Sequence, residues 1–264
     1  EMGNSGVEGM LNVYLIRNLE KRLVWSVTGK IAYNKNVILK LSDALKEDTR
    51  KALAEDIELG TLLFEGDPTN AIYAVRSLGI DPSTGKELYL TKDGEITETW
   101  KSSDRVFLGS YDPKYRGNIS SLFQWGGLSI NLAFGYHFGG YQYNSTLLSK
   151  VEINKNMISA GNVDKRVYED RWQKPGDVKF FKKIDDKSTK ATSRFVMKES
   201  VFELQNVSLQ YTFDGPKFKE KTKMQALLIG LNMSEILYLS TIRLERGTGY
   251  PYARHAALSL SVTF

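Results

Sequence analysis

Apolar and polar residues alternate with the period of a β-strand in several segments of this chain. In the clearest, residues 127–139, Leu132 and Phe134 belong to an apolar row, whereas Asn131 and Ala133 belong to a polar row. The same alternation is found in residues 23–35, 206–213, 227–233 and 258–264, and it places Leu209 and Ile229 in apolar rows. Because successive side chains of a strand point to opposite faces, each segment is predicted to have one apolar and one polar face.

Two weaker segments, residues 7–17 and 115–125, raise the predicted number of strands to about seven. Each segment is near the length of ~9–11 residues that a tilted strand needs to cross a bilayer. Phe202 and Leu204 fall out of register with the apolar row of residues 206–213, which indicates a β-bulge between them and that row.

The connections between these segments alternate in length. Residues 18–22, 126–127 and 214–222 are short, whereas residues 36–114, 140–198 and 237–252 are long and polar. Short turns on one side and long loops on the other are typical of a bacterial outer-membrane barrel with its long loops outside the cell. We therefore predict an all-β fold, an antiparallel transmembrane β-barrel with long extracellular loops, in which Leu132, Phe134, Leu209 and Ile229 face the membrane.

Alternation has a second explanation, because a soluble or surface-attached β-sandwich would use the same apolar rows as its core. A glycan-binding sandwich and a passive porin-like barrel therefore stay open as alternatives. The aromatic residues near strand ends favour the membrane, where they would form interfacial girdles, with core packing as the other reading. They are Trp25, Tyr33, Trp125, Tyr136 and Tyr211.

The first long connection carries local structure of its own. Ser42 precedes an amphipathic pattern with Leu45, Leu53 and Ile57, which indicates a short helix capped by Ser42. Asp93 and Gly94 lie between two apolar stretches and predict a hairpin turn. We interpret both as decoration of the loop, the alternative being that they add strands to the barrel.

Composition excludes several classes of protein. The 264 residues are 41% hydrophobic and include no cysteine, so the chain folds without disulfides or thiolate sites. No run approaches the ~18 apolar residues of a membrane helix. The net charge of +5 is dispersed, which argues against nucleic acid as a partner. His137 and His255 have no second histidine or cysteine with which to build a site and are predicted to be structural, so we expect no cofactor and no catalytic residue.

Short motifs in this order resemble the SusC/RagA family of TonB-dependent outer-membrane transporters. The resemblance is carried by Asn4–Glu8, Trp25, Tyr33–Asn36, the turn Gly79–Gly85, the stretch Asp112–Gly117, the motif Arg171–Asp177 (Arg-Trp-Gln-Lys-Pro-Gly-Asp), Ser200–Phe213, and residues 249–264 closing on Phe264. Each motif is weak alone, and their order over nearly the whole chain makes the resemblance specific.

The resemblance implies that residues 1–264 form the carboxy-terminal part of a barrel of about 22 strands. The plug domain and the earlier barrel strands have no counterpart here, so contact with TonB is expected through those absent parts. The implied function is energised import of an oligosaccharide, or otherwise an oligopeptide, across the outer membrane of a Gram-negative bacterium. A SusD-like surface lipoprotein is the implied partner, and the chain is expected not to be an enzyme.

Residues of the second long connection are the candidates for substrate contact. Tyr141, Tyr143, Tyr168 and Trp172 offer flat faces for stacking on sugar rings, and Arg171, Lys174 and Asp177 offer hydrogen bonds. The other reading is that these residues pack the loop against itself. For the motif Arg171–Asp177 we prefer this loop-shaping role.

Overall fold

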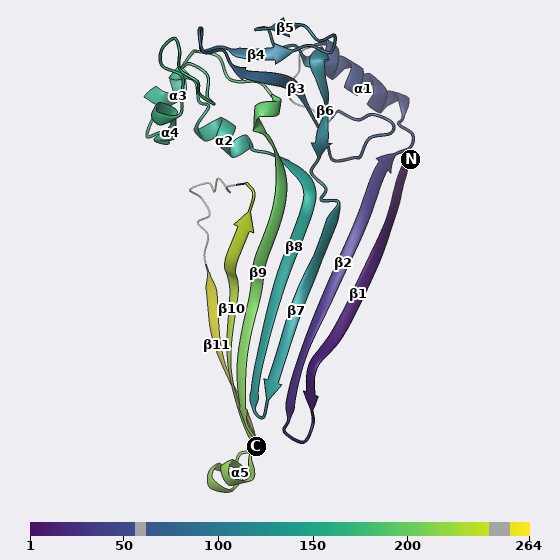
Figure 1. The fold of residues 1–264 in the computed structure, drawn as a ribbon, viewed down its shortest axis with the longest axis vertical. Helices are drawn as coiled ribbons and strands as arrows, with labels where there is room; N and C mark the ends of the chain where they lie inside the picture. The colour runs from purple at the N-terminus through teal and green to yellow at the C-terminus, as the bar shows by residue number, and fades with distance from the viewer. Residues whose placement is uncertain (56–61, 243–253) are drawn as a thin grey trace.

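A computed structural model of the protein describes residues 1–55, 62–242 and 254–264. It consists of a tall antiparallel sheet and a smaller folded body at one end of that sheet (Figure 1). Strands account for 51% of the structure and helices for 16%, so the predicted predominance of β-structure is confirmed.

Seven strands form the tall sheet, in the order β1-β2-β7-β8-β9-β10-β11, with every neighbouring pair antiparallel. The predicted number of strands is therefore confirmed. Several strands run past the predicted segments toward the long connections. Their bounds are β1 Met2–Asn18, β2 Leu23–Ile38, β7 Tyr115–Trp125, β8 Leu128–Tyr143, β9 Val196–Phe213, β10 Ala226–Ser240 and β11 His255–Thr263.

The register places the predicted apolar rows on one side of the sheet, which we name the apolar face; the opposite side is the polar face. Leu132 pairs with Val207, and Phe134 pairs with Leu204. The step from Val207 to Leu204 leaves Gln205 as an extra residue in β9, which confirms the predicted bulge. The bulge keeps the apolar row of β9 on the same side as that of β8.

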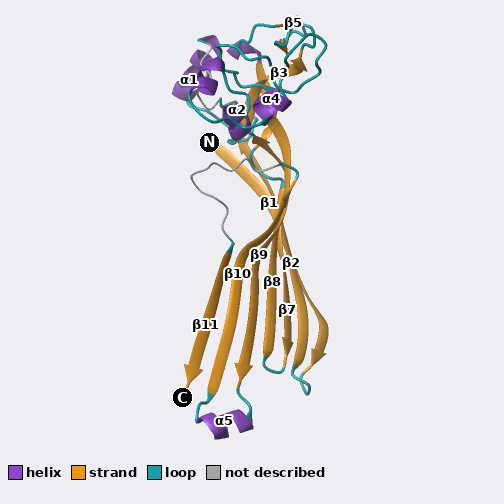
Figure 2. Ribbon diagram, turned by 90° about the vertical axis from the view of Figure 1, so that its left-hand side faces the viewer, coloured by secondary structure: helices purple, strands orange, loops and turns teal. Residues whose placement is uncertain are grey.

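No second layer covers the apolar face in the part of the chain that the structure describes (Figures 1 and 2). Leu209 is 40% exposed, Ile229 38% and Leu260 68%. A soluble sandwich would bury these rows against a second sheet, and the buried residues of this chain instead lie mainly in the folded body.

The first long connection forms a four-stranded sheet of its own, in the order β5-β4-β3-β6, beside helix α1. The interpretation as loop decoration is confirmed, and extra strands in the tall sheet are not. Ser42 caps α1 by accepting from the Leu45 amide, and the turn at Gly94 joins β4 to β5; Ile57 lies outside the described residues. The bounds are α1 Asp43–Ala54, β3 Ala71–Ile80, β4 Glu87–Leu90, β5 Ile96–Thr97, η1 Ser102–Asp104 and β6 Arg105–Ser110.

The second long connection is helical in short pieces that the alternation did not predict. Its core consists of Leu147, Val151, Ile153, Val167, Phe181 and Phe195. Among the described residues, no helix has both the length and the apolar character needed to span a membrane. The pieces are α2 Ser145–Lys150, α3 Lys155–Ser159, α4 Arg166–Glu169 and η2 Ser193–Phe195, and a separate helix, α5 Pro216–Thr222, joins β9 to β10.

Candidate functional site: an apolar face and a loop body

Aromatic side chains gather at two levels of the apolar face. Toward the long connections, the loop end, Tyr33 contacts Tyr115 with ring centroids 5.2 Å apart, and Tyr115 stacks on Phe138 at 5.0 Å. Toward the short turns, the turn end, Trp25 meets Phe123 edge-on at 6.5 Å. We name these groups the loop-end band and the turn-end band. Tyr136 joins the first, with its ring centroid 6.3 Å from that of Phe138, and Trp125 and Tyr211, which both pair with Leu128, join the second. The five girdle residues predicted from the sequence thus lie in the two bands.

The spacing of the bands matches an apolar membrane layer. Tyr115 and Trp125 are ten positions apart on β7, which corresponds to roughly 33 Å along a strand. With the usual tilt of a barrel strand this becomes about 25 Å along the membrane normal, the height of the apolar band of outer-membrane barrels. Between the bands lie Leu132, Ile119 and Phe134, whereas Ile130 and Leu209 lie level with Phe123.

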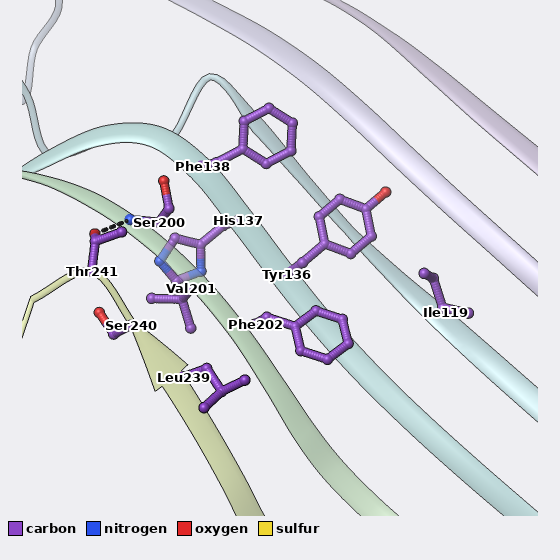
Figure 3. Close-up of a pocket in the computed structure, with 10 residues that line it drawn as sticks. All are labelled: Ile119, Tyr136, His137, Phe138, Ser200, Val201, Phe202, Leu239, Ser240 and Thr241. Carbon is purple, nitrogen blue, oxygen red and sulfur yellow. Dashed lines mark hydrogen bonds between the residues drawn. The ribbon is translucent and has the colours of Figure 1, made fainter.

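A hollow of about 550 Å³ interrupts the loop-end band between β8, β9 and β10 (Figure 3). Tyr136, Phe138, Phe202 and Leu239 are among the residues that line it, so it continues the apolar face. At its rim the Ser200 amide donates to Thr241 Oγ1 at 2.9 Å.

The polar face carries hydroxyl, amide and charged side chains. His137 Nε2 lies 3.4 Å from Glu199 Oε2, consistent with its predicted structural role. Lys30, Arg116 and Glu8 line a second hollow, of about 580 Å³. Among the described residues, no group of three His, Cys, Asp or Glu side chains is arranged to hold a metal.

The two long connections pack together into one unit, the loop body, comprising residues 39–55, 62–114 and 144–195. The amide of Val75 donates to Ala191 O at 3.3 Å, and the amide of Lys183 donates to Gly85 O at 2.9 Å. Residues far apart in the sequence thus share backbone hydrogen bonds, and both connections are held over the loop end of the sheet (Figure 2).

Two motifs singled out from the sequence meet in the loop body. The Trp172 indole Nε1 donates to Pro82 O at 2.9 Å, and the Gly176 amide donates to the same oxygen at 2.8 Å. Gly85 has a φ of +70°, and a Cβ built there would lie 2.5 Å from the Trp172 ring. The turn Gly79–Gly85 therefore needs glycine at this position both for its backbone conformation and for the ring packed against it.

A buried ionic cluster joins the two connections. Arg194 contacts Glu87 at 2.7 Å and Glu152 at 2.8 Å, and the three side chains are 5%, 1% and 0% exposed. Its guanidinium also lies 4.9 Å from the centre of the Phe195 ring. Burial lowers the pKa of Arg194, but the hydrogen bonds that Arg194 donates to Glu87 and the charge of Glu152 outweigh burial and raise the pKa overall. The arginine is therefore charged and bridges β4 to both ends of the second connection.

Arg171, a predicted substrate residue, lies in the interior of the loop body. It is 1% exposed and donates through Nη2 to Val151 O, while burial lowers its pKa. Its Nε and Nη1 have no hydrogen-bond partner among the described residues. Asp177 accepts from the amides of Gln173 and Lys174, both at 3.0 Å, and closes the turn of the motif. These contacts are those of the preferred loop-shaping role.

The remaining predicted substrate residues differ in accessibility. Tyr141 lies against Gly109, where a Cβ would meet its ring at 2.4 Å, and Tyr143 meets Phe195 edge-on at 6.3 Å. Tyr168 is 75% exposed and Lys174 is exposed. Substrate contact by any of the seven residues stays a prediction.

The sequence reading missed Arg194, Glu87 and Glu152, because ionic residues in long polar loops give no periodic signal. An indirect signal was available. Glu87 lies two positions after the turn Gly79–Gly85, and Arg194 lies six positions before the motif Ser200–Phe213, so both lie near stretches that the sequence singles out.

These features define a class of protein: a single-layer antiparallel sheet with one uncovered apolar face, aromatic bands at two levels and a folded body at one end. No family model matches the chain, and no curated protein matches it. Solved structures of one transporter do have this fold. The chain superposes on the structure of the RagAB peptide transporter with a TM-score of 0.72 and 21% identity over 91% of its length. The RagAB peptide importer in its open-open and closed-closed states gives TM-scores of 0.75 and 0.65, with 19% and 21% identity over 100% and 90% of the chain.

The chain spans between 26% and 29% of the length of the chains it matches. The resemblance to this group of transporters, inferred above from short motifs, is confirmed at the level of the fold.

Proposed function

We propose that this chain forms part of the wall and the extracellular loops of a large outer-membrane β-barrel of the SusC/RagA type, which imports a nutrient by TonB-dependent active transport. The observation that carries the proposal is the uncovered apolar face between two aromatic bands. In water that face would be unstable, at a cost of about 25 cal/mol for each Å² of apolar surface. Lipid acyl chains on the apolar face would remove its apolar side chains from water. Further barrel strands beside β1 and β11 would supply hydrogen-bond partners to the backbone groups at these two edges.

Neighbouring residues on β8 and β9 provide a direct test of which face meets lipid. The chain has no cysteine, so single cysteines at Leu132 and Leu209, with Asn131 and Ser208 as matched controls, can carry a nitroxide label. In the native membrane, labels at Leu132 and Leu209 should collide with oxygen dissolved in the acyl chains, and labels at the controls should not. Equal collision rates within both pairs would refute the membrane facing.

Energised uptake separates this proposal from a passive porin-like barrel. Collapsing the proton gradient with a protonophore should stop uptake by a TonB-dependent importer, since TonB draws on that gradient through a plug that these residues do not form. A passive barrel would continue to admit its solute.

The cargo is proposed to be an oligosaccharide or an oligopeptide. The exposed ring of Tyr168 suits stacking on a sugar, whereas the similar solved structures are described as peptide importers, which favours the second class. Uptake of labelled oligosaccharides and labelled oligopeptides by cells with and without the gene decides between them. The class whose uptake is lost with the gene is the cargo.

A SusD-like lipoprotein is proposed to cap the loop body, as the resemblance to the SusC/RagA family implies. Tyr168, Val178 and Ile96 are 75%, 84% and 64% exposed on the loop body and offer it apolar contacts. Val178→Asp should reduce copurification of the lipoprotein. Leu19→Asp, which changes an apolar residue that is 67% exposed at the turn end, should not, and equal effects would exclude this contact surface.

A further inference from the structure

The connection between β9 and β10 is unusually basic. It forms the helix α5 and carries Lys217, Lys219, Lys221 and Lys223; its two acidic residues are Asp214, which precedes the helix, and Glu220 within it. The turn between β7 and β8, by contrast, consists of two glycines. Figures 1 and 2 show α5 at the turn end, far from the loop body. The four lysines are exposed.

An aromatic residue ties α5 to the apolar face. The Phe218 ring lies 5.9 Å from Phe213, which in turn lies 4.6 Å from Tyr211 in the turn-end band. Phe218 therefore extends that band beyond the end of the strand. An ion pair of 3.2 Å between Arg22 and Asp214 joins the start of the connection to the turn between β1 and β2.

The order of residues around α5 gives it two sides. With about 100° of rotation per residue, Lys217, Lys219 and Lys221 lie on either flank of Phe218, roughly 60–100° away. Glu220 lies roughly 160° away, on the opposite side. An apolar centre flanked by lysines, with the acidic residue pointing away, is the arrangement of a helix that lies in the plane of a membrane interface.

We propose that α5 binds the anionic headgroups of phospholipids at the membrane surface on the turn side, with Phe218 at the boundary of the acyl chains and the lysines at the phosphates. The inference rests on the proposed membrane wall, because only a sheet that crosses the bilayer places α5 at that surface. Charge complementarity selects the lipid: Asp214 is paired with Arg22, so four lysines beside the one remaining carboxylate, that of Glu220, favour phosphatidylglycerol over a zwitterionic lipid.

Lysines near the end of a helix also stabilise its carboxy-terminal carbonyls, so loss of stability alone would not establish lipid binding. The test must therefore measure the lipid. The protein is purified from outer membranes into nanodiscs of equimolar phosphatidylglycerol and phosphatidylcholine, and the lipids retained on detergent release are counted by native mass spectrometry.

Wild-type protein should retain phosphatidylglycerol preferentially. Changing the four lysines to glutamine should lower this preference at least tenfold, since each lysine near an anionic surface contributes about fivefold. Changing four lysines of the loop body, Lys92, Lys101, Lys150 and Lys155, to glutamine is the matched control and should leave the preference unchanged. Inorganic phosphate at millimolar concentration should not displace the lipid from an interfacial helix that also holds acyl chains through Phe218.

Each outcome is decisive. An equal preference in wild type and the α5 variant overturns this inference and leaves the proposed function standing. Failure to retain any lipid of either kind overturns the proposed membrane wall itself. If the α5 variant does not assemble, the wild type at 0.5 M salt makes the same comparison, because screening should remove the preference while the protein stays folded.

Discussion

Replacing Arg194 with methionine should separate the two long connections while leaving the seven-stranded sheet intact. Methionine retains the aliphatic bulk of the side chain, so the main effect is that the carboxylates of Glu87 and Glu152, which are 1% and 0% exposed, lose their cation. Removing one partner of a buried ion pair costs about 3–5 kcal/mol. At about 1.4 kcal/mol per tenfold change, opening of the loop body should become roughly 10²–10⁴ times more frequent.

Hydrogen exchange measured by mass spectrometry detects this opening locally. The Val75 amide donates across the two connections to Ala191 O, so peptides covering β3 should lose protection, whereas peptides covering β8 should keep theirs. The control is Lys86→Met, which removes a surface ion pair with Glu98 whose side chains are 49% and 41% exposed. Such pairs contribute about 0–1 kcal/mol, so protection should hardly change.

A triple change provides the second arm. Glu87→Gln and Glu152→Gln added to Arg194→Met remove the whole ionic cluster, and replacing a buried cluster entirely is often nearly neutral. The triple variant should therefore regain most of the protection lost in the single variant. Unchanged protection of β3 in Arg194→Met, or equal losses in the single variant and the Lys86→Met control, would refute the bridging role of Arg194.

Three further changes test the sheet and the motifs. Leu132→Arg should destabilise the assembled protein by about 2–4 kcal/mol, and Asn131→Arg by much less; equal thermal stabilities in the membrane would contradict the facing. Gly85→Val should displace the ring of Trp172 and cost about 1–3 kcal/mol, visible as altered indole fluorescence, and an unaltered spectrum would exclude the packing described. The backbone amides of Gln173 and Lys174 hold the pKa of Asp177 below its ordinary 3.8. The ionised carboxylate therefore stabilises the turn fully above pH 3.8, and this stabilisation is lost as the pH falls through the lowered pKa of Asp177. The amides of the turn should lose their protection from exchange over the same range. Asp177→Asn should abolish this pH dependence. If the dependence persists in the variant, a group other than Asp177 is responsible for it.

The strands could be predicted because a strand with one apolar and one polar face has a sequence in which apolar and polar residues alternate. Residues 127–139 predicted β8, and the misfit of Leu204 with the row at Val207 predicted the bulge at Gln205. The ends of the strands at the loop body could not be predicted from the alternation. β8 continues to Tyr143 and β9 begins at Val196, where the sheet runs into the loop body and one-sided burial no longer selects alternating residues.

The loop body could be predicted only in pieces. Ser42 and Gly94 have local chemistry, a helix cap and a turn, and both were recognised. The contact of Trp172 with Pro82, and of Arg194 with Glu87, joins residues about 90 and 107 positions apart. Such contacts depend on the arrangement of two loops over a common support, and neither periodicity nor composition encodes that arrangement.

The two parts of the chain are stabilised by different means. The loop body has its own interior, with Val151 and Phe195 both 0% exposed and a charged cluster sealed beside them. The sheet has backbone pairing but no interior, and its apolar side chains are exposed to the surrounding medium. If that medium is lipid, as proposed, removing detergent from the purified protein should cause it to aggregate through its apolar face. The loop body should keep its protection from hydrogen exchange. The loss of both together would mean that the loop body depends on the sheet for its fold.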